Sequence, residues 1–345
     1  MLDDASRRTA RIAVLLALWY SSSIVTSLTT KSILREFPFP IGVALVQQAM
    51  AASLSYLSWR WQLRADQSEP PELHRHSAAF APIAIVMVMS LVSYRWSLLS
   101  VSVSFTHTIK TLGPLFTIVF SRVLLQERMP ASRYLSVLPV VVGVAIATST
   151  EVEFALVGFA CAVFSTVCQA LQNVLAKRVL GEAGVSKAEL FCVAAVYAFL
   201  MLVPLFAALE AWQLRMVGAD AWRHTARWML VNGLASFANQ FTGLSVLDEM
   251  SSPLSHALAN VMKRAAVISM AFVYANRPVT PLHLCGVGMS VFGTLVYRQL
   301  DHCRPDRVTI DGYELVPLTD AAGASLTDDP EAPQGSAGET KLDPG

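Results

Sequence analysis

Charged residues are scarce in this sequence. Only 15% of its 345 residues are Asp, Glu, Lys or Arg, whereas ordinary soluble domains carry about 25%. Hydrophobic residues make up 54%, and the mean hydropathy is +0.49. A soluble core cannot use that much apolar surface, but a lipid bilayer can. The sequence therefore predicts an all-α membrane protein, and its net charge of +1 gives no sign of a nucleic-acid partner.

The residue patterns that most enzymes need are also lacking. None of the five cysteines forms a Cys-x-x-Cys pair, and four of them lie in apolar runs, which favours simple packing. The apolar segments carry no carboxylate pair, no cluster of metal ligands and no activated nucleophile. We therefore expect no enzymatic activity, no catalytic residue, no metal site and no cofactor.

Long apolar runs dominate the chain. A helix needs roughly 20 apolar residues to cross a bilayer core. Ten segments come close to this length and predict ten transmembrane helices: Ile12–Thr30, Ile41–Trp59, Ala79–Ser100, Val103–Leu125, Tyr134–Thr150, Ala155–Ala176, Leu190–Leu209, Trp228–Leu247, Pro253–Ala275 and Pro281–Tyr297.

The predicted helices divide the chain into four parts. These are an N-terminus (residues 1–11), a first five-helix half (12–150), a second five-helix half (155–297) and a polar, disordered tail (305–345). With a cytosolic N-terminus, fifteen Lys and Arg residues fall on the cytosolic side and six on the other. This bias predicts that both termini are cytosolic. The N-terminal part is expected to be too short for a plastid or mitochondrial transit peptide.

The two halves repeat a pattern of polar residues. His107 lies 21 residues before Arg128, and His256 lies 21 residues before Arg277. Because each half has five spans, the second half enters the membrane from the opposite side. The pattern predicts an inverted repeat, which places a solute site at the midplane between the halves. The sequence match is weak, so chance similarity is the alternative.

Four cations remain inside the predicted spans: Arg95, Lys110, Lys263 and Arg264. A cation at the bilayer centre costs at least about 2.5–3.5 kcal/mol. No Asp or Glu lies inside any of the ten spans, so these cations are expected to face a wet cavity or to bind an incoming anion. Phosphate suits the fork of Arg and the point charge of Lys. Arg95 lies about six residues from its span end and is expected to reach the headgroups instead.

Polar neighbours are consistent with a lined cavity. His107 is one turn from Lys110, and His256, Asn260 and Lys263 lie close to one face of their helix. Asn239 in the eighth span is a further candidate for solute binding. For each of these side chains, an interhelical hydrogen bond is the alternative. The same alternative is favoured for the amides of the sixth span, which include Gln169.

Gly113 and Pro114 follow Lys110 closely. Proline removes a helical hydrogen bond, so the pair is expected to loosen the fourth helix, as broken helices do near transporter sites. A kink that serves only packing is the alternative.

Four segments resemble the triose-phosphate translocator family of the drug/metabolite transporter superfamily, which is related to nucleotide-sugar transporters. The first, Val101–Phe154, contains SFTHTIK; the second, Gln172–Leu180, is QNVLAKRVL; the third, Ser252–Arg264, is SPLSHALANVMKR. The fourth, Arg277–Tyr297, contains the apolar, Gly-containing last span. The resemblance implies ten helices in two inverted halves and strict exchange of phosphorylated metabolites. It also implies that Lys110, Lys263 and Arg264 hold the phosphate.

The sequence departs from the plastid members at three positions. Their His and Thr of the third helix fall near Leu91 and Tyr94, and their Tyr of the eighth falls near Phe237–Asn239. The resemblance therefore implies that this chain keeps the phosphate-binding cations of the family, but it does not imply triose-phosphate specificity. It is closest to the non-plastid, endomembrane members, which implies a Golgi or related membrane.

The expected function is that of an antiporter that exchanges a phosphorylated organic anion, such as a sugar phosphate, against phosphate by alternating access. A nucleotide-sugar/nucleotide monophosphate exchanger is the first alternative. A membrane scaffold or sensor that does not transport is the second. The expected partners are the phosphorylated solute, a phosphate-type counter-anion and the lipid bilayer.

Overall fold

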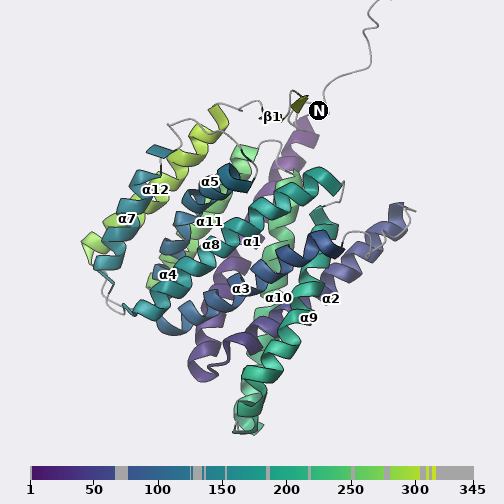
Figure 1. Cartoon of the computed structure of the whole chain (residues 1–345), viewed down its shortest axis with the longest axis vertical. Helices are drawn as coiled ribbons and strands as arrows, with labels where there is room; N and C mark the ends of the chain where they lie inside the picture. Colours follow the sequence, from purple (N-terminus) through teal and green to yellow (C-terminus); the bar gives the residue numbers. More distant parts are fainter. Residues whose placement is uncertain are drawn as a thin grey trace, which may run out of the picture. The chain divides into compact units, whose positions relative to one another are not determined.

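The computed structural model describes residues 2–66, 77–124, 126, 134–135, 137–151, 154–183, 187–216, 219–249, 253–275, 280–303, 308–310 and 313–315. The chain divides into two units, residues 1–304 and 305–345. The described part of the first unit is built of helices (Figure 1).

The helices of the first half coincide with the first five predicted spans. They are α1 (Leu2–Glu36), α2 (Pro40–Asp66), α3 (Ser77–Ser100), α4 (Val103–Ile109), the 3₁₀ turn η1 (Lys110–Leu112), α5 (Gly113–Leu124) and α7 (Leu138–Ser149). The fourth predicted span is thus broken into α4, η1 and α5.

The helices of the second half coincide with the other five predicted spans. They are α8 (Leu156–Ala183), α9 (Lys187–Leu209), the short 3₁₀ segment η2 (Ala211–Met216), α10 (Ala219–Glu249), α11 (Pro253–Ala275) and α12 (Pro281–Cys303). By length and composition, five helices among the described residues can cross a membrane, namely α1, α2, α3, α8 and α9. Shorter apolar stretches lie in α7 and α12. The count of ten membrane spans stays a prediction.

The surface and the interior of this unit are both apolar. Leu34, Leu98 and Phe105 have no exposed surface, whereas Val273 is 74% exposed and Leu156 is 70% exposed. Exposed apolar side chains recur along most of the helices. Patches of this kind mark surfaces that contact other apolar matter, and a lipid bilayer provides it.

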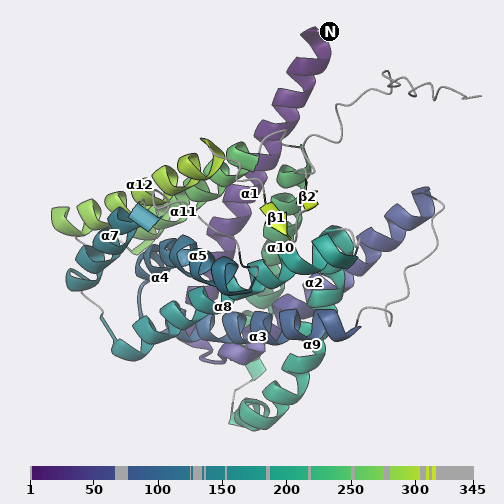
Figure 2. The same ribbon diagram turned by 45° about the horizontal axis from the view of Figure 1, so that its top comes forward.

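Helices that are distant in the sequence pack side by side. The most extensive contacts join α3 to α8, α1 to α10, α7 to α12 and α2 to α9 (Figures 1 and 2). In each pair, one helix comes from the first half of the chain and the other from the second. The two halves are therefore intertwined and do not form two separate lobes.

The contact between α7 and α12 requires glycine. A Cβ atom on Gly143 would lie 2.5 Å from the backbone N of Ser290 and 2.6 Å from the carbonyl O of Gly286. A Cβ on Gly286 would lie 2.7 Å from the backbone N of Ala147. Small residues at such crossings let two helix backbones approach closely, as is common between membrane helices.

The side chain of Glu210, the residue that follows α9, caps the first turn of α2. Glu210 accepts hydrogen bonds from the backbone N–H groups of Ile41 (3.0 Å) and Gly42 (2.8 Å). The carboxylate thereby satisfies two of the amides that a helix leaves without intrahelical partners. Burial raises the pKa of the Glu210 carboxyl, and the two backbone hydrogen bonds oppose this effect. Pro40 at the first helical position has no N–H that would need a partner.

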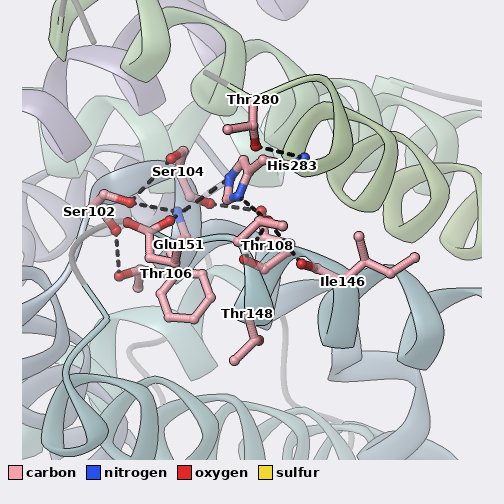
Figure 3. Close-up of polar contacts among 12 residues, drawn as sticks. Ser102, Ser104, Thr106, Thr108, Ile146, Thr148, Glu151, Thr280 and His283 are labelled. Carbon is pink, nitrogen blue, oxygen red and sulfur yellow. Dashed lines mark hydrogen bonds and ion pairs between the residues drawn. The ribbon is translucent and has the colours of Figure 1, made fainter. Parts of the chain in front are cut away.

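A second polar cluster joins the end of α7 to the start of α12 (Figure 3). His283 Nε2 lies 3.8 Å from Glu151 Oε2, and both side chains are buried. The other ring nitrogen of His283 lies 3.0 Å from Thr150 Oγ1. Ser102 caps α4 nearby by accepting a hydrogen bond of 3.2 Å from the backbone N–H of Phe105. The Ser102 cap stabilises the N-terminal end of α4, and Lys110 of the candidate site follows its C-terminal end.

The second unit contains one described antiparallel pair of short strands. In it, β1 (Val308–Ile310) pairs with β2 (Tyr313–Leu315), and Thr309 lies opposite Glu314. The rest of the predicted tail lies outside the described residues, so its disorder stays a prediction.

Candidate functional site

The fourth span breaks at Lys110. Its ψ angle of −14° departs from the helical value, and the chain makes one 3₁₀ turn before α5 begins at Gly113. Pro114 explains the break, because it has no N–H to donate to the carbonyl of Lys110, four residues earlier. A 3₁₀ stretch in the middle of a helix often marks a functional hinge. The sequence predicted this loosening, and the structure places it at the candidate site residue itself.

The side chain of Lys110 rests on neutral groups of two other helices. Its Nζ atom lies 4.0 Å from the centre of the Tyr94 ring, which belongs to α3. It also donates a weak hydrogen bond of 3.4 Å to Gln169 Oε1 of α8. Gln169 was expected only to join helices, but it contacts the lysine.

The two cations of α11 contact different helices. Successive residues of a helix are rotated by about 100°, so Lys263 and Arg264 diverge. Lys263 Nζ lies 4.2 Å from the centre of the Trp19 ring of α1. Arg264 donates a hydrogen bond through NH1 to the backbone carbonyl of Lys110. The pair thus connects α11 both to α1 and to the break in the fourth span.

His107 lies one turn before Lys110 and joins two helices. Its Nε2 atom is 3.2 Å from Ser27 Oγ of α1 and 3.2 Å from the Tyr94 hydroxyl. The rings of His107 and Tyr94 meet edge to face, with centroids 6.0 Å apart. These contacts fit the alternative of an interhelical hydrogen bond, and they also place the imidazole beside the cations.

The charges of these residues act on one another. Lys110 interacts electrostatically with Arg264, Arg95 and Lys263. His107 interacts in the same way with Lys110, Arg264 and Lys263. Two like charges 4 Å apart repel by about 4 kcal/mol at an effective dielectric constant of about 20, and less at larger distances. Aromatic rings and carbonyl oxygens offset part of this repulsion. An anion bound between the cations would offset more of it.

The expectation for Arg95 is wrong. Its side chain does not reach a headgroup region, because the residue is only 2% exposed and lies inside the protein. The guanidinium donates to the carbonyl O of Leu91 at 2.6 Å and to Gln47 Oε1. Gln47 in turn contacts Asn232 and Thr30. The Nε atom of Arg95 is buried without a hydrogen-bond partner.

Asn239 lies on α10 beside the α1 contact. Its Oδ1 atom is buried and has no hydrogen-bond partner. One turn later, a Cβ on Gly243 would lie 2.8 Å from Trp19 Nε1, so glycine lets the indole pack closely against α10. Trp19 in turn lies beneath Lys263.

The remaining two candidates cannot be placed by their side chains. His256 and Asn260 belong to α11, but their side chains lie outside the described part of the structure. Their role stays a prediction. By contrast, Trp19 and Tyr94 contact the lysines directly, and the sequence reasoning missed these contacts. Spacing along one helix does not reveal which aromatic ring another helix presents to a lysine.

A family model identifies the family to which this chain belongs. The model described as "Triose-phosphate Transporter family" matches residues 10–298. The chain belongs to the triose-phosphate transporter family. It is therefore a multi-pass membrane protein of a transporter family and not an enzyme.

Curated relatives are about 30% identical to this family member over the aligned residues. The phosphoenolpyruvate/phosphate translocator 1 of Oryza sativa subsp. japonica is 30% identical over 305 residues, which are 86% of this chain and 74% of the relative. The xylulose 5-phosphate/phosphate translocator of Arabidopsis thaliana is 30% identical over 306 residues, 86% of this chain and 72% of that one. The glucose-6-phosphate/phosphate translocator 2 of the same plant is 28% identical over 306 residues, 86% and 77% of the two chains. All three are named as chloroplastic proteins.

A solved structure shows the same fold. This crystal structure is 16% identical in sequence and superimposes with a TM-score of 0.52, over 85% of this chain and 98% of the other. At this identity, the similarity concerns the fold alone.

Proposed function

We propose that this protein is an antiporter that exchanges a phosphorylated organic anion, such as a sugar phosphate, against phosphate by alternating access. The observation that carries the proposal is the contact between the two segments, one from each half of the chain, that carry Lys110, Lys263 and Arg264. Lys110 comes from the broken fourth span, and the other two come from α11. The hydrogen bond from Arg264 to the Lys110 carbonyl brings the two segments together.

The packing of the helices supports an inverted repeat. If the two halves are equivalent, α1 corresponds to α8, α2 to α9, α3 to α10, the broken fourth span to α11, and α7 to α12. The contact between α3 and α8 then has its counterpart in the contact between α10 and α1, and that between α2 and α10 in that between α9 and α3. The contacts of α7 with α12, of α2 with α9 and of α4 with α11 are their own counterparts. An exchanger with a central site needs this symmetry to open alternately to each side.

Interaction energies favour an anion over the neutral partners that the cations contact. A cation over an aromatic ring gains about 0.5–2 kcal/mol. A hydrogen bond to an ionised group is worth about 1.5–3 kcal/mol, and a phosphate can accept several of them. Lys110 and Lys263 would therefore exchange Tyr94 and Trp19 for phosphate oxygens when the solute binds. The sequence supports this preference, because the predicted spans contain no carboxylate that would compete.

The relatives support phosphate as one of the exchanged ions. They are named as translocators of phosphoenolpyruvate, xylulose 5-phosphate or glucose 6-phosphate together with phosphate. Their organic substrates differ, so the phosphoryl group is the chemistry that their names share. We propose the same shared chemistry here and leave the organic part of the solute to the transport assay. A nucleotide-sugar/nucleotide monophosphate exchanger remains the alternative that this assay includes.

We further propose that both termini are cytosolic and that the protein lies in a Golgi or related endomembrane. The orientation is supported by the bias of Lys and Arg toward one side of the predicted spans. Fluorescence microscopy of the tagged full chain, with protease protection of a tag at each end, tests both statements. A chloroplast location like that of the named relatives would contradict the endomembrane proposal.

Exchange in liposomes tests the function. Purified full-length protein is reconstituted into liposomes loaded with phosphate, with a nucleotide monophosphate or with neither. Uptake of labelled sugar phosphates, phosphoenolpyruvate and nucleotide sugars is then measured. We expect uptake of a sugar phosphate or phosphoenolpyruvate only into phosphate-loaded liposomes. Uptake of nucleotide sugars only against nucleotide monophosphate would favour the alternative, and no uptake of any phosphorylated solute would refute transport of such anions.

Matched variants test the site. Lys263→Ala and Arg264→Ala each remove a cation of the candidate site, so we expect them to abolish most of the exchange. Arg122→Ala removes an exposed cation at the end of α5 and should leave exchange unchanged. Full exchange by both site variants would contradict the assignment of these residues.

A further inference from the structure

The carbonyl of Lys110 has an unusual position within the fourth span. In a continuous α-helix, it would accept the N–H of the residue four positions later. Here that residue is Pro114, which has no N–H. The carbonyl instead accepts the N–H of Gly113 in the 3₁₀ turn. A carbonyl oxygen has two lone pairs, so this arrangement leaves it able to accept a second hydrogen bond.

Arg264 provides that second hydrogen bond. Its NH1 group donates to the Lys110 carbonyl across the contact between α11 and the fourth span. A guanidinium carries five N–H donors in a rigid planar fork. One bond to a carbonyl therefore restrains the direction of the fork and is compatible with bidentate contact to a phosphate. Lys110 thus contributes to the site through its ammonium and through its backbone.

We propose that Pro114 is a positioning residue for the cations that bind the anion. Because Pro114 donates no N–H to the Lys110 carbonyl, this carbonyl stays available to orient Arg264. The inference rests on the proposed function, because it assumes that Arg264 binds the phosphoryl group. It deepens that proposal, because it assigns a role in the site to a residue that has no polar side chain.

The substitution Pro114→Ala tests this role with a predictable sign. Alanine restores an N–H four residues after Lys110. Three donors would then compete for the two lone pairs of the carbonyl: this N–H, the N–H of Gly113 and the Arg264 guanidinium. Alanine is also a far better helix former than proline. A merely structural proline would therefore give a variant that is as stable as the parent or more stable, with an unchanged KM. A positioning proline gives equal or greater thermal stability together with a raised KM for phosphate.

The experiment combines two substitutions in one cycle. The KM and kcat of phosphate exchange are measured in liposomes for the parent, Pro114→Ala, Arg264→Lys and the double variant. We expect Pro114→Ala to raise the KM about five- to tenfold, which is the effect of weakening one hydrogen bond to a charged group. In the Arg264→Lys background, the same change should have no further effect, because lysine lacks the planar fork that the carbonyl orients.

A control variant and a second measurement keep the outcomes distinct. Pro82→Ala changes an exposed proline inside α3, away from the site, and should leave the KM unchanged. Pro114→Ser also restores the N–H and replaces Pro114→Ala if the latter does not fold. Binding of inorganic phosphate, measured as a rise in melting temperature, gives a readout that does not need transport.

The outcomes separate the two proposals. A parent protein that neither exchanges nor binds phosphate would refute the proposed function, and the role of Pro114 with it. A parent that exchanges phosphate, with an unchanged KM in Pro114→Ala, would refute the role of Pro114 alone. A rise in KM that is equally large in the Arg264→Lys background would also refute it, because Pro114 would then act by a path that does not include Arg264.

Discussion

The close contact between α7 and α12 gives the sharpest prediction about the fold. In Gly143→Ala, the new Cβ atom would lie 2.5 Å from the backbone N of Ser290, 2.6 Å from the carbonyl O of Gly286 and 2.9 Å from the Ser290 Cα. All three are backbone atoms, so a rotamer change cannot relieve the overlap. Overpacking of this kind costs about 1–3 kcal/mol even where side chains can adjust. We expect Gly143→Ala to lose at least this much stability.

The same helix pair contains a matched control. Gly288 also lies on α12, but a Cβ there would meet no atom within 4 Å. Gly288→Ala should therefore be neutral or stabilising, by up to about 1 kcal/mol from helix propensity. Thermal unfolding of the purified variants in the same detergent gives the comparison. Equal melting temperatures for Gly143→Ala and the parent would show that the two helices do not cross this closely.

Three further predictions concern polar contacts. Glu210→Ala leaves two buried first-turn amides of α2 without their acceptor, so the protein should lose about 1–3 kcal/mol of stability, seen as a lower melting temperature. Tyr94→Phe keeps the aromatic ring beneath Lys110 but loses the hydrogen bond between the Tyr94 hydroxyl and His107. We therefore expect about 1 kcal/mol less stability and an unchanged KM for phosphate exchange. His283→Phe removes the imidazole that lies 3.8 Å from the Glu151 carboxylate, so it should destabilise the fold. Adding Glu151→Leu should restore part of the lost stability, because no buried carboxylate then remains at that contact.

The helices could be predicted from the sequence because apolar runs of sufficient length have one favourable structure in a bilayer. Helices cover nearly all the described residues of the ten predicted segments. The break after Lys110 could be predicted as well, because Pro114 lacks an N–H whatever surrounds it. These are local properties of the chain, and they do not depend on the packing of other helices.

Contacts between helices could not be predicted in the same way. The position of Arg95 along α3 indicated its depth, but its rotation about the helix axis is set by packing, which turns it toward Gln47. The contacts of Lys263 with Trp19 and of Lys110 with Gln169 likewise join helices that are distant in the sequence. The pattern of apolar residues in such helices does not specify these rotations, because the lipid and the interior are both apolar.

The central claim is that three partly buried cations from two halves of the chain bind a phosphoryl group. The most direct test measures the melting temperature of the purified protein with increasing inorganic phosphate. A ligand at about 100 times its dissociation constant stabilises a folded protein by about 2.7 kcal/mol. The account predicts a saturable rise for the parent and for Arg122→Ala, but none for Lys263→Ala or Arg264→Ala. An equal rise in all four proteins would contradict it, because phosphate would then bind elsewhere.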